Sequence, residues 1–122
     1  MNIRVLAIDD SRTMRDLLRA ALEKAGFWVA TAEDGAEAVE QLEAAAPDVI
    51  ITDINMPRLD GFGVIEAVRG SRCAATVPIL VLSTESSPEM KNRARMSGAT
   101  GWIVKPFDDA RLISAIRRVA RV

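Results

Sequence analysis

The sequence contains no histidine and only one cysteine, and both scarcities restrict the chemistry open to the chain. Without an imidazole base, the Ser–His and Cys–His nucleophile arrangements are excluded, and so are metal sites built on histidine. Cys73 has no second cysteine to pair with, so no intramolecular disulfide can form. We expect Cys73 to be a reduced thiol, buried or in a loop, in a cytosolic protein.

An excess of one charge and a long apolar run are also missing. The chain carries 16 Lys and Arg residues against 17 Asp and Glu residues, which gives no indication of a nucleic-acid-binding surface. Its start contains too short an apolar run for a signal peptide, and no stretch is long enough to span a membrane. We therefore expect a cytoplasmic protein that binds neither membranes nor nucleic acids, folded as one domain over residues 1–122.

Short apolar stretches alternate with amphipathic ones along the chain. Predicted strands cover residues 4–8, 27–32, 49–53, 79–82 and 102–104. Predicted helices lie between 11 and 26, 34 and 46, 62 and 70, 88 and 98, and from about 108 onward. Five strands alternating with helices predict an α/β fold, a flavodoxin-like (βα)5 doubly wound parallel sheet with strand order 2-1-3-4-5.

Two of these helices have distinctive apolar patterns. The first has a face at helical spacing that we expect to be buried, made of Met14, Leu17, Leu18, Ala21, Leu22 and Ala25. The helix between 88 and 98 has few apolar residues. We expect that helix to be weakly held and to be the element that responds to a signal.

Acidic residues end two strands that are neighbours in this order. Asp9 and Asp10 follow the first strand and Asp53 ends the third, at the point where open α/β sheets bind ligands. Alone, Asp53 could simply start a turn and Asp10 could cap a helix, but Asp9 has no such explanation. Three close carboxylates repel by roughly 1–4 kcal/mol per pair, which a divalent cation would cancel. Oxygen ligands of this kind favour Mg²⁺.

Lys105 and Ser83 end the fifth and fourth strands at the same edge of the sheet. Lys105 could form an ordinary salt bridge, but an ammonium group is also suited to bind a phosphoryl oxygen. Ser83 adds a hydroxyl donor. A carboxylate nucleophile with Mg²⁺, a lysine and a hydroxyl describes a site that accepts a phosphoryl group on Asp53 as an acyl phosphate.

With these residues assembled, the chain resembles the response-regulator receiver domain of two-component signalling. The resemblance covers essentially the whole chain and rests on Asp9-Asp10, Asp53, Ser83 and Lys105-Pro106 at successive strand ends. Within the family, residues 10–15 and 98–107 are similar to the CheY-like receivers of chemotaxis, which stand alone without an output domain. The resemblance implies a phosphoacceptor that catalyses its own phosphorylation and dephosphorylation and is not an enzyme acting on a separate substrate.

The resemblance also implies a role for each matching residue. Asp53 would be the phosphoacceptor, Asp10 a direct Mg²⁺ ligand, Asp9 a ligand through water, and Asn55 a ligand through its backbone carbonyl. Ser83 and Lys105 would contact the phosphoryl group, and the Lys105-Pro106 bond would be cis.

Two further positions concern switching and turnover. Ser83 and Trp102 would form the switch pair, with the aromatic ring turning inward when Ser83 moves toward the phosphoryl group. Thr84 stands where the family commonly has alanine or glycine. We expect its bulk to slow the entry of water and of small phosphodonors.

The partners implied are proteins. The helix at 88–98, the fifth strand and the last helix would share a partner-binding face that carries Lys91, Arg95, Trp102, Arg111 and Arg118. A CheA-like histidine kinase would supply the phosphoryl group to a monomer. A flagellar motor switch protein or another protein target would receive the signal.

Three other functions use similar residues. A phosphate sink or relay shuttle keeps the same chemistry without binding a motor. A flavodoxin-like nucleotide-binding module would need a phosphate loop after the first strand, where Asp9-Asp10 would repel a phosphate. A Mg²⁺-dependent aspartate phosphatase would need a second carboxylate two residues after its nucleophile, but Asn55 follows Asp53 here.

Overall fold

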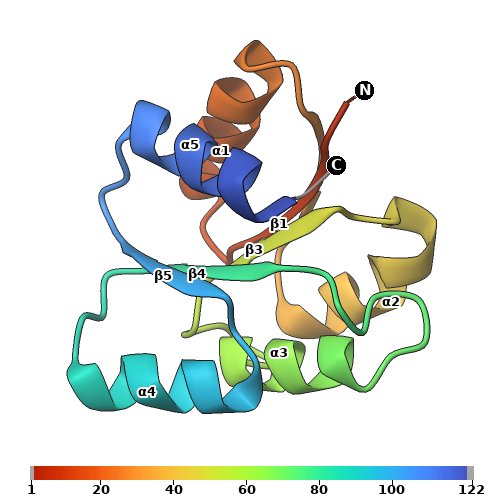
Figure 1. Cartoon of the computed structure of the whole chain (residues 1–122), viewed down its shortest axis with the longest axis vertical. Helices are drawn as coiled ribbons and strands as arrows, with labels where there is room; N and C mark the ends of the chain where they lie inside the picture. Colours follow the sequence, from red (N-terminus) through yellow and green to blue (C-terminus); the bar gives the residue numbers. More distant parts are fainter. Residues whose placement is uncertain (1, 121–122) are drawn as a thin grey trace.

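The computed structural model describes residues 2–120, which form a parallel sheet with helices on both faces (Figure 1). The strands are β1 (Arg4–Ile8), β2 (Trp28–Ala32), β3 (Val49–Thr52), β4 (Ile79–Ser83) and β5 (Gly101–Val104). The helices are α1 (Arg12–Lys24), α2 (Gly35–Ala45), α3 (Gly61–Arg69), α4 (Pro88–Ser97) and α5 (Asp109–Ala120). The strands are parallel and lie in the order β2-β1-β3-β4-β5, which confirms the predicted flavodoxin-like (βα)5 fold.

The helices form two layers, one on each face of the sheet. Helices α1 and α5 lie together on one face, and α2, α3 and α4 cover the other (Figure 1). Alternate residues of a strand therefore enter different cores: Leu6 and Ile50 belong to one apolar cluster, Ala7 and Ile51 to the other. Because both faces are covered, the central strands are continuous apolar runs rather than alternating ones.

Polar side chains fix where the helices start. Ser11, Asp34, Asp60 and Ser87 each precede a helix and accept a hydrogen bond from an amide in its first turn. Pro88 occupies the start of α4, and Gly98 ends it with a φ of 115°. Between residues 2 and 120, no helix combines the length and apolar character needed to cross a membrane.

Three local expectations are changed or narrowed by the structure. Leu17 is 53% exposed, so its predicted burial is wrong. Successive helix residues are about 100° apart, which places Leu17 at the edge of the buried stripe that contains Leu18. Strand β2 starts at Trp28, one residue later than predicted, although Phe27 is buried. The sequence predicts that Cys73 is either buried or in a loop. It is an exposed thiol in the connection between α3 and β4, so the loop location is the observed one.

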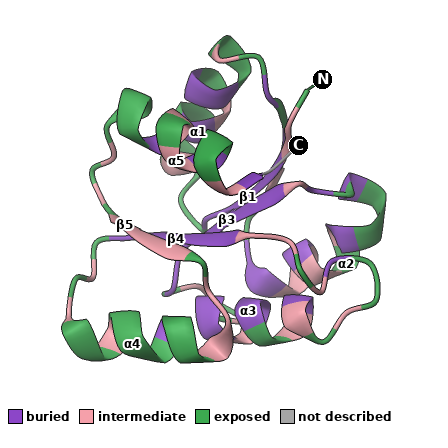
Figure 2. Ribbon diagram, in the orientation of Figure 1, coloured by how far each residue is buried: buried purple, intermediate pink, exposed green. Residues whose placement is uncertain are grey.

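Helix α4 is the least buried of the helices. Ala94 is the only buried residue among the ten of α4, and most of the helix is exposed in Figure 2. This confirms the sparse apolar contact predicted from the sequence. Few apolar side chains therefore attach α4 to the rest of the domain.

Candidate functional site

Three carboxylates meet where β1 and β3 end. Ile8 pairs with Thr52 in the parallel register, so the residues that follow them, Asp9 and Asp53, leave the sheet side by side. Each of Asp9, Asp10 and Asp53 offers a carboxylate oxygen, and these three oxygens lie within 4.8 Å of one another. The structure thus brings together the acidic residues that the sequence predicted to converge.

The three carboxylates differ in exposure and in partners. Asp9 is 1% exposed, and its Oδ1 accepts a hydrogen bond of 2.9 Å from the Ser11 amide. Asp53 is 9% exposed, and its Oδ1 accepts a bond of 2.6 Å from the Ile54 amide. Asp10 is exposed. The cluster therefore has a buried interior and one side that solvent and ligands can reach.

Lys105 joins the two buried carboxylates. Its Nζ donates to Asp9 Oδ2 at 2.8 Å and to Asp53 Oδ2 at 2.9 Å, and its side chain is 11% exposed. Burial alone lowers the pKa of Lys105, but hydrogen bonds and charges from Asp9 and Asp53 outweigh that effect, so the pKa is raised. Lys105 is thus a positive ammonium group between two carboxylates.

The backbone holds Lys105 and Asp53 in place. The Lys105 amide donates to the Ser83 carbonyl at 2.8 Å, and the Lys105-Pro106 bond is cis, as expected. The Asp53 amide donates to the Ile8 carbonyl at 3.0 Å. A Cβ on Gly61 would overlap the Asp53 carbonyl oxygen, so the start of α3 can approach the acidic residue only because position 61 is glycine.

Ser83, Thr84 and Asn55 lie around this cluster with different environments. Ser83 is fully buried, and its Oγ accepts a hydrogen bond of 3.2 Å from the Glu85 amide. In the described part of the chain, neither Lys105 nor Asp53 hydrogen-bonds that hydroxyl. Thr84 and Asn55 are exposed beside the buried residues.

Trp102 is linked to Ser83 through the main chain of Glu85. The indole Nε1 donates to the Glu85 carbonyl at 2.9 Å, while the Glu85 amide donates to Ser83. Trp102 is partly buried and packs against the core that includes Ala94. Sequence reasoning paired Ser83 with Trp102 but missed this bridge. No sequence signal could identify it, because every residue except proline offers the same main-chain groups.

A sequence profile of the response regulator receiver domain matches residues 5–117. The chain belongs to this family. It is the receiver domain of a two-component response regulator, with the parallel sheet and two helix layers described above.

Relatives of this receiver domain differ in their overall length. The chemotaxis protein CheY4 of Vibrio cholerae is 44% identical with a TM-score of 0.93, and the match covers 98% of this chain and 99% of that one. Response regulator MprA of Mycobacterium tuberculosis is 36% identical over 99% of this chain and 52% of its own length. Transcriptional regulatory protein PrrA of Mycobacterium bovis is 41% identical over 97% of this chain and 50% of its own length. The receiver domain therefore spans about half the length of the curated relatives it matches.

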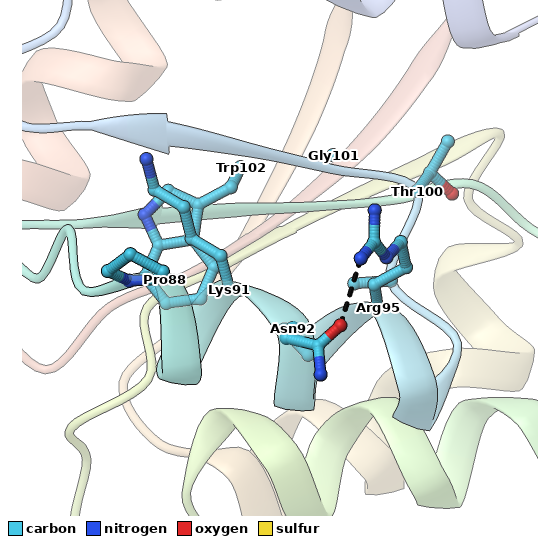
Figure 3. Close-up of a pocket in the computed structure, with 9 residues that line it drawn as sticks. Pro88, Lys91, Asn92, Arg95, Thr100, Gly101 and Trp102 are labelled. Carbon is cyan, nitrogen blue, oxygen red and sulfur yellow. Dashed lines mark hydrogen bonds between the residues drawn. The ribbon is translucent and has the colours of Figure 1, made fainter.

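A groove between α4 and β5 lies apart from the acidic cluster of the receiver domain (Figure 3). Its volume is about 410 Å³, and its lining includes Pro88, Lys91, Asn92, Arg95, Thr100, Gly101 and Trp102. The structure thus brings together three residues of the predicted partner face, Lys91, Arg95 and Trp102. Arg111 and Arg118 are exposed on α5 and do not line this groove.

Proposed function

We propose that Asp53 of this receiver domain accepts a phosphoryl group from a phosphorylated histidine kinase in the presence of Mg²⁺, and that phosphorylation changes binding to a protein partner. The observation that carries the proposal is the position of Lys105, whose Nζ lies 2.9 Å from Asp53 Oδ2 and 2.8 Å from Asp9 Oδ2. An ammonium group fixed beside a carboxylate nucleophile suits a phosphoryl oxygen that arrives on that carboxylate.

The donor set at this edge of the sheet fits Mg²⁺. Asp9, Asp10 and Asp53 place carboxylate oxygens within 4.8 Å of one another, and hard oxygen ligands with an open, solvated side suit this ion. These residues would hold the ion, together with the backbone carbonyl of Asn55. When bound, Mg²⁺ neutralises charge on the transferred phosphoryl group and orients it.

The chemistry of the chain itself is a nucleophilic displacement. A carboxylate oxygen of Asp53 forms a bond to phosphorus as the bond from phosphorus to the imidazole nitrogen of the kinase breaks, and the imidazole leaves with the electron pair of that bond. Lys105 contacts a phosphoryl oxygen. Water later attacks the phosphorus and releases inorganic phosphate, which restores the Asp53 carboxylate. The protein is therefore a phosphoacceptor that catalyses its own turnover, not an enzyme with a separate substrate.

Signalling requires that the phosphoryl group be sensed outside the acidic cluster. The Ser83 Oγ accepts a hydrogen bond of 3.2 Å from the Glu85 amide, and movement of this side chain toward the phosphoryl group would change that bond. Movement of the Glu85 backbone then shifts its carbonyl oxygen, which accepts the 2.9 Å hydrogen bond from the Trp102 indole. Ser83 and Trp102 would thus switch as a pair, with Glu85 as the link.

A role in chemotaxis is the finer part of the proposal. Its support is the 44% identity with Vibrio cholerae CheY4 over nearly all of both chains. The target would be a flagellar motor switch protein, bound at the face that carries Lys91, Arg95, Trp102, Arg111 and Arg118. In a phosphate sink or relay shuttle the phosphorylated protein would show no motor binding.

A second candidate is the receiver part of a transcription regulator. PrrA is 41% identical over 97% of this chain and is called a transcriptional regulatory protein. In that role the phosphorylated receiver would act on an output domain rather than on a motor. A binding measurement with a motor switch protein separates the two roles.

The test of the shared chemistry is transfer of labelled phosphate. A phosphorylated histidine kinase of the CheA type is mixed with the protein, with Mg²⁺ or with a chelator. Labelling that requires Mg²⁺ and is lost in base supports an acyl phosphate. Absence of labelling from several kinases would instead indicate a binding module that works without phosphate.

Replacing Thr84 by alanine is expected to speed dephosphorylation of the labelled protein by about three- to tenfold, which corresponds to about 1 kcal/mol of activation free energy. Thr84 is exposed next to buried Ser83, where its side chain would obstruct water on the path to the phosphoryl group. The rate is measured as loss of label after the kinase is removed. Thr76→Ala, an exposed threonine before β4 at the opposite edge of the sheet, is the control, and an equal rate in Thr84→Ala would contradict the prediction.

Reversing the charge of Arg95 is expected to weaken partner binding. Arg95→Glu replaces a cation of the groove with an anion, and we expect the Kd of the phosphorylated protein for a motor switch protein to rise about tenfold. The matched control is Lys24→Glu at the end of α1, away from the groove. Titration calorimetry that finds the same Kd for both variants and the wild type would show that this face does not bind the partner.

Trp102 should report the switch by its fluorescence. The chain has two tryptophans, and Trp28→Phe leaves Trp102 as the only one. Beryllofluoride with Mg²⁺ mimics the phosphoryl group, and we expect it to change the Trp102 emission because the hydrogen bond to Glu85 is altered. The change should saturate with the mimic and be absent in Asp53→Asn. Identical spectra with and without the mimic would show that Trp102 does not take part.

A further inference from the structure

Helix α4 makes fewer buried apolar contacts than the other helices. Ala94 is its only buried residue, and Met96 is 81% exposed. The amino end is fixed by Ser87, which accepts a bond of 3.2 Å from the Met90 amide. At the carboxyl end, the Gly98 and Ala99 amides donate to the carbonyls of Arg95 and Ala94 at 3.0 and 2.9 Å, and the carbonyl of Gly98 accepts hydrogen bonds from outside the helix.

A guanidinium group from α3 donates these hydrogen bonds to the Gly98 carbonyl. Arg69, at the end of α3, donates from Nε and Nη2 to the Gly98 carbonyl at 3.0 and 2.7 Å. Its Nη1 donates to the carbonyls of Ala75 and Val77 at 3.1 and 2.6 Å. Three segments of the chain therefore meet on one side chain: α3, the connection from α3 to β4, and the end of α4.

The charge of Arg69 is directed at carbonyl oxygens. Among residues 2–120 no carboxylate forms an ion pair with it, and burial lowers the pKa of the guanidinium. A cation at the carboxyl end of α4 is stabilised by the negative end of the helix dipole. The fit is close, since a Cβ on Gly98 would lie 2.9 Å from Arg69 Cγ and Nε.

A second arginine forms a contact between α3 and α4. The Arg93 guanidinium of α4 lies 3.9 Å from the centre of the Phe62 ring of α3, and Phe62 is 4% exposed. Cation–aromatic contacts of this kind are directional and depend on the position of the helix. Two arginines therefore add polar links between α3 and the α4 region to the apolar contacts of Ala94 and Met90.

We propose that Arg69 is a latch that holds the carboxyl end of α4 in place and thereby sets the shape of the groove between α4 and β5. Gly98, which the latch grips, is followed directly by Ala99, Thr100 and Gly101, and these residues line the groove. Release of the latch frees the end of α4 and the adjoining part of the groove wall at Ala99, while Thr100 stays bonded to Ile79 of β4. The latch stands on its contacts alone, and only its effect on partner binding rests on the proposed function.

Hydrogen exchange of the full chain tests the latch directly. In Arg69→Met, we expect the α4 amides to exchange at least tenfold faster than in the wild type, beyond any change in the slowest amides of β1 and β3. Arg69→Lys keeps the charge and most of the stem but loses the fork of donors, so it should give an intermediate effect. The control is Arg72→Met, which replaces an exposed arginine in the connection between α3 and β4. It should leave the exchange rates of the α4 amides unchanged.

The outcomes divide clearly. Exchange in α4 that is unchanged in both Arg69 variants, or raised by one common factor throughout the chain, overturns the latch. If Arg69→Met does not fold, Arg69→Lys alone decides by the same comparison. Transfer of labelled phosphate to Asp53 is measured in parallel. A wild-type protein that takes up no label would refute the proposed function, and the hydrogen-exchange result would still decide whether Arg69 is a latch.

Discussion

Asp53→Asn is expected to reduce Mg²⁺-dependent labelling by the histidine kinase to background, a loss of at least about 1,000-fold, as when a catalytic nucleophile is removed. The amide is neutral and lacks the nucleophilic oxygen that forms the acyl phosphate. The asparagine carbonyl oxygen can still accept the hydrogen bond of the Ile54 amide, and Lys105 keeps its bond to Asp9, so we expect the fold to persist although the bond from Lys105 to the second oxygen is lost. Labelled phosphate on the protein is the measurement.

The control for this variant is another Asp→Asn replacement. Asp16 is exposed on α1, outside the acidic cluster, so Asp16→Asn should be labelled like the wild type. Circular dichroism and thermal unfolding of both variants show whether the fold is retained. Undiminished labelling of folded Asp53→Asn would move the phosphoacceptor to another residue and remove the basis of the proposed site.

The strand ends were predictable from the sequence because the parallel fold limits where they can lie. A buried apolar run that ends at Asp53, and another that ends at Asp9, place both carboxylates at one edge of the sheet once the strand order is known. The positions of Lys105 and Ser83 at the same edge of the sheet follow in the same way, because they lie at the ends of β5 and β4. What brings them together is topology, and topology is encoded in the periodicity of apolar residues.

The contacts that connect this site to the rest of the chain were not predictable in the same way. The bond from Trp102 goes to a main-chain carbonyl of Glu85, and the bonds from Arg69 go to three other carbonyls. These acceptors are present at every position, so only the folded geometry selects among them. Leu17 was misplaced for a related reason: helical spacing gives the direction of a buried face but not its width.

Under the proposed function, phosphorylation of Asp53 must change the conformation of the protein as well as add a charge. Moving a population from about 1% to about 99% active takes roughly 5.5 kcal/mol of differential stabilisation. Hydrogen bonds to charged groups contribute about 1.5–3 kcal/mol each. Contacts from the phosphoryl group to Lys105 and Ser83 that exist in only one state therefore reach much of this value.

Lys105→Met is expected to lower the free energy of unfolding by about 3–5 kcal/mol in the presence of a chelator, because it removes the cation of a buried ionic cluster. The side chains of Lys105, Asp9 and Asp53 are only 11%, 2% and 12% exposed, so water screens the two carboxylates poorly. Methionine fills a similar volume without charge. Urea denaturation at neutral pH is the measurement, and Lys91→Met on exposed α4 should change stability by less than about 0.5 kcal/mol.

Mg²⁺ should restore more stability to Lys105→Met than to the wild type. In the wild type the ammonium group already neutralises the carboxylates that would hold the ion, whereas in the variant the ion takes over that charge. An ion present at 100 times its Kd adds about 2.7 kcal/mol, so most of the loss is recoverable. If the variant is as stable as the wild type with chelator present, or if Mg²⁺ stabilises both equally, then Lys105 and the ion do not share Asp9 and Asp53. The electrostatic account of the site would then be wrong, whatever the labelling of Asp53 shows.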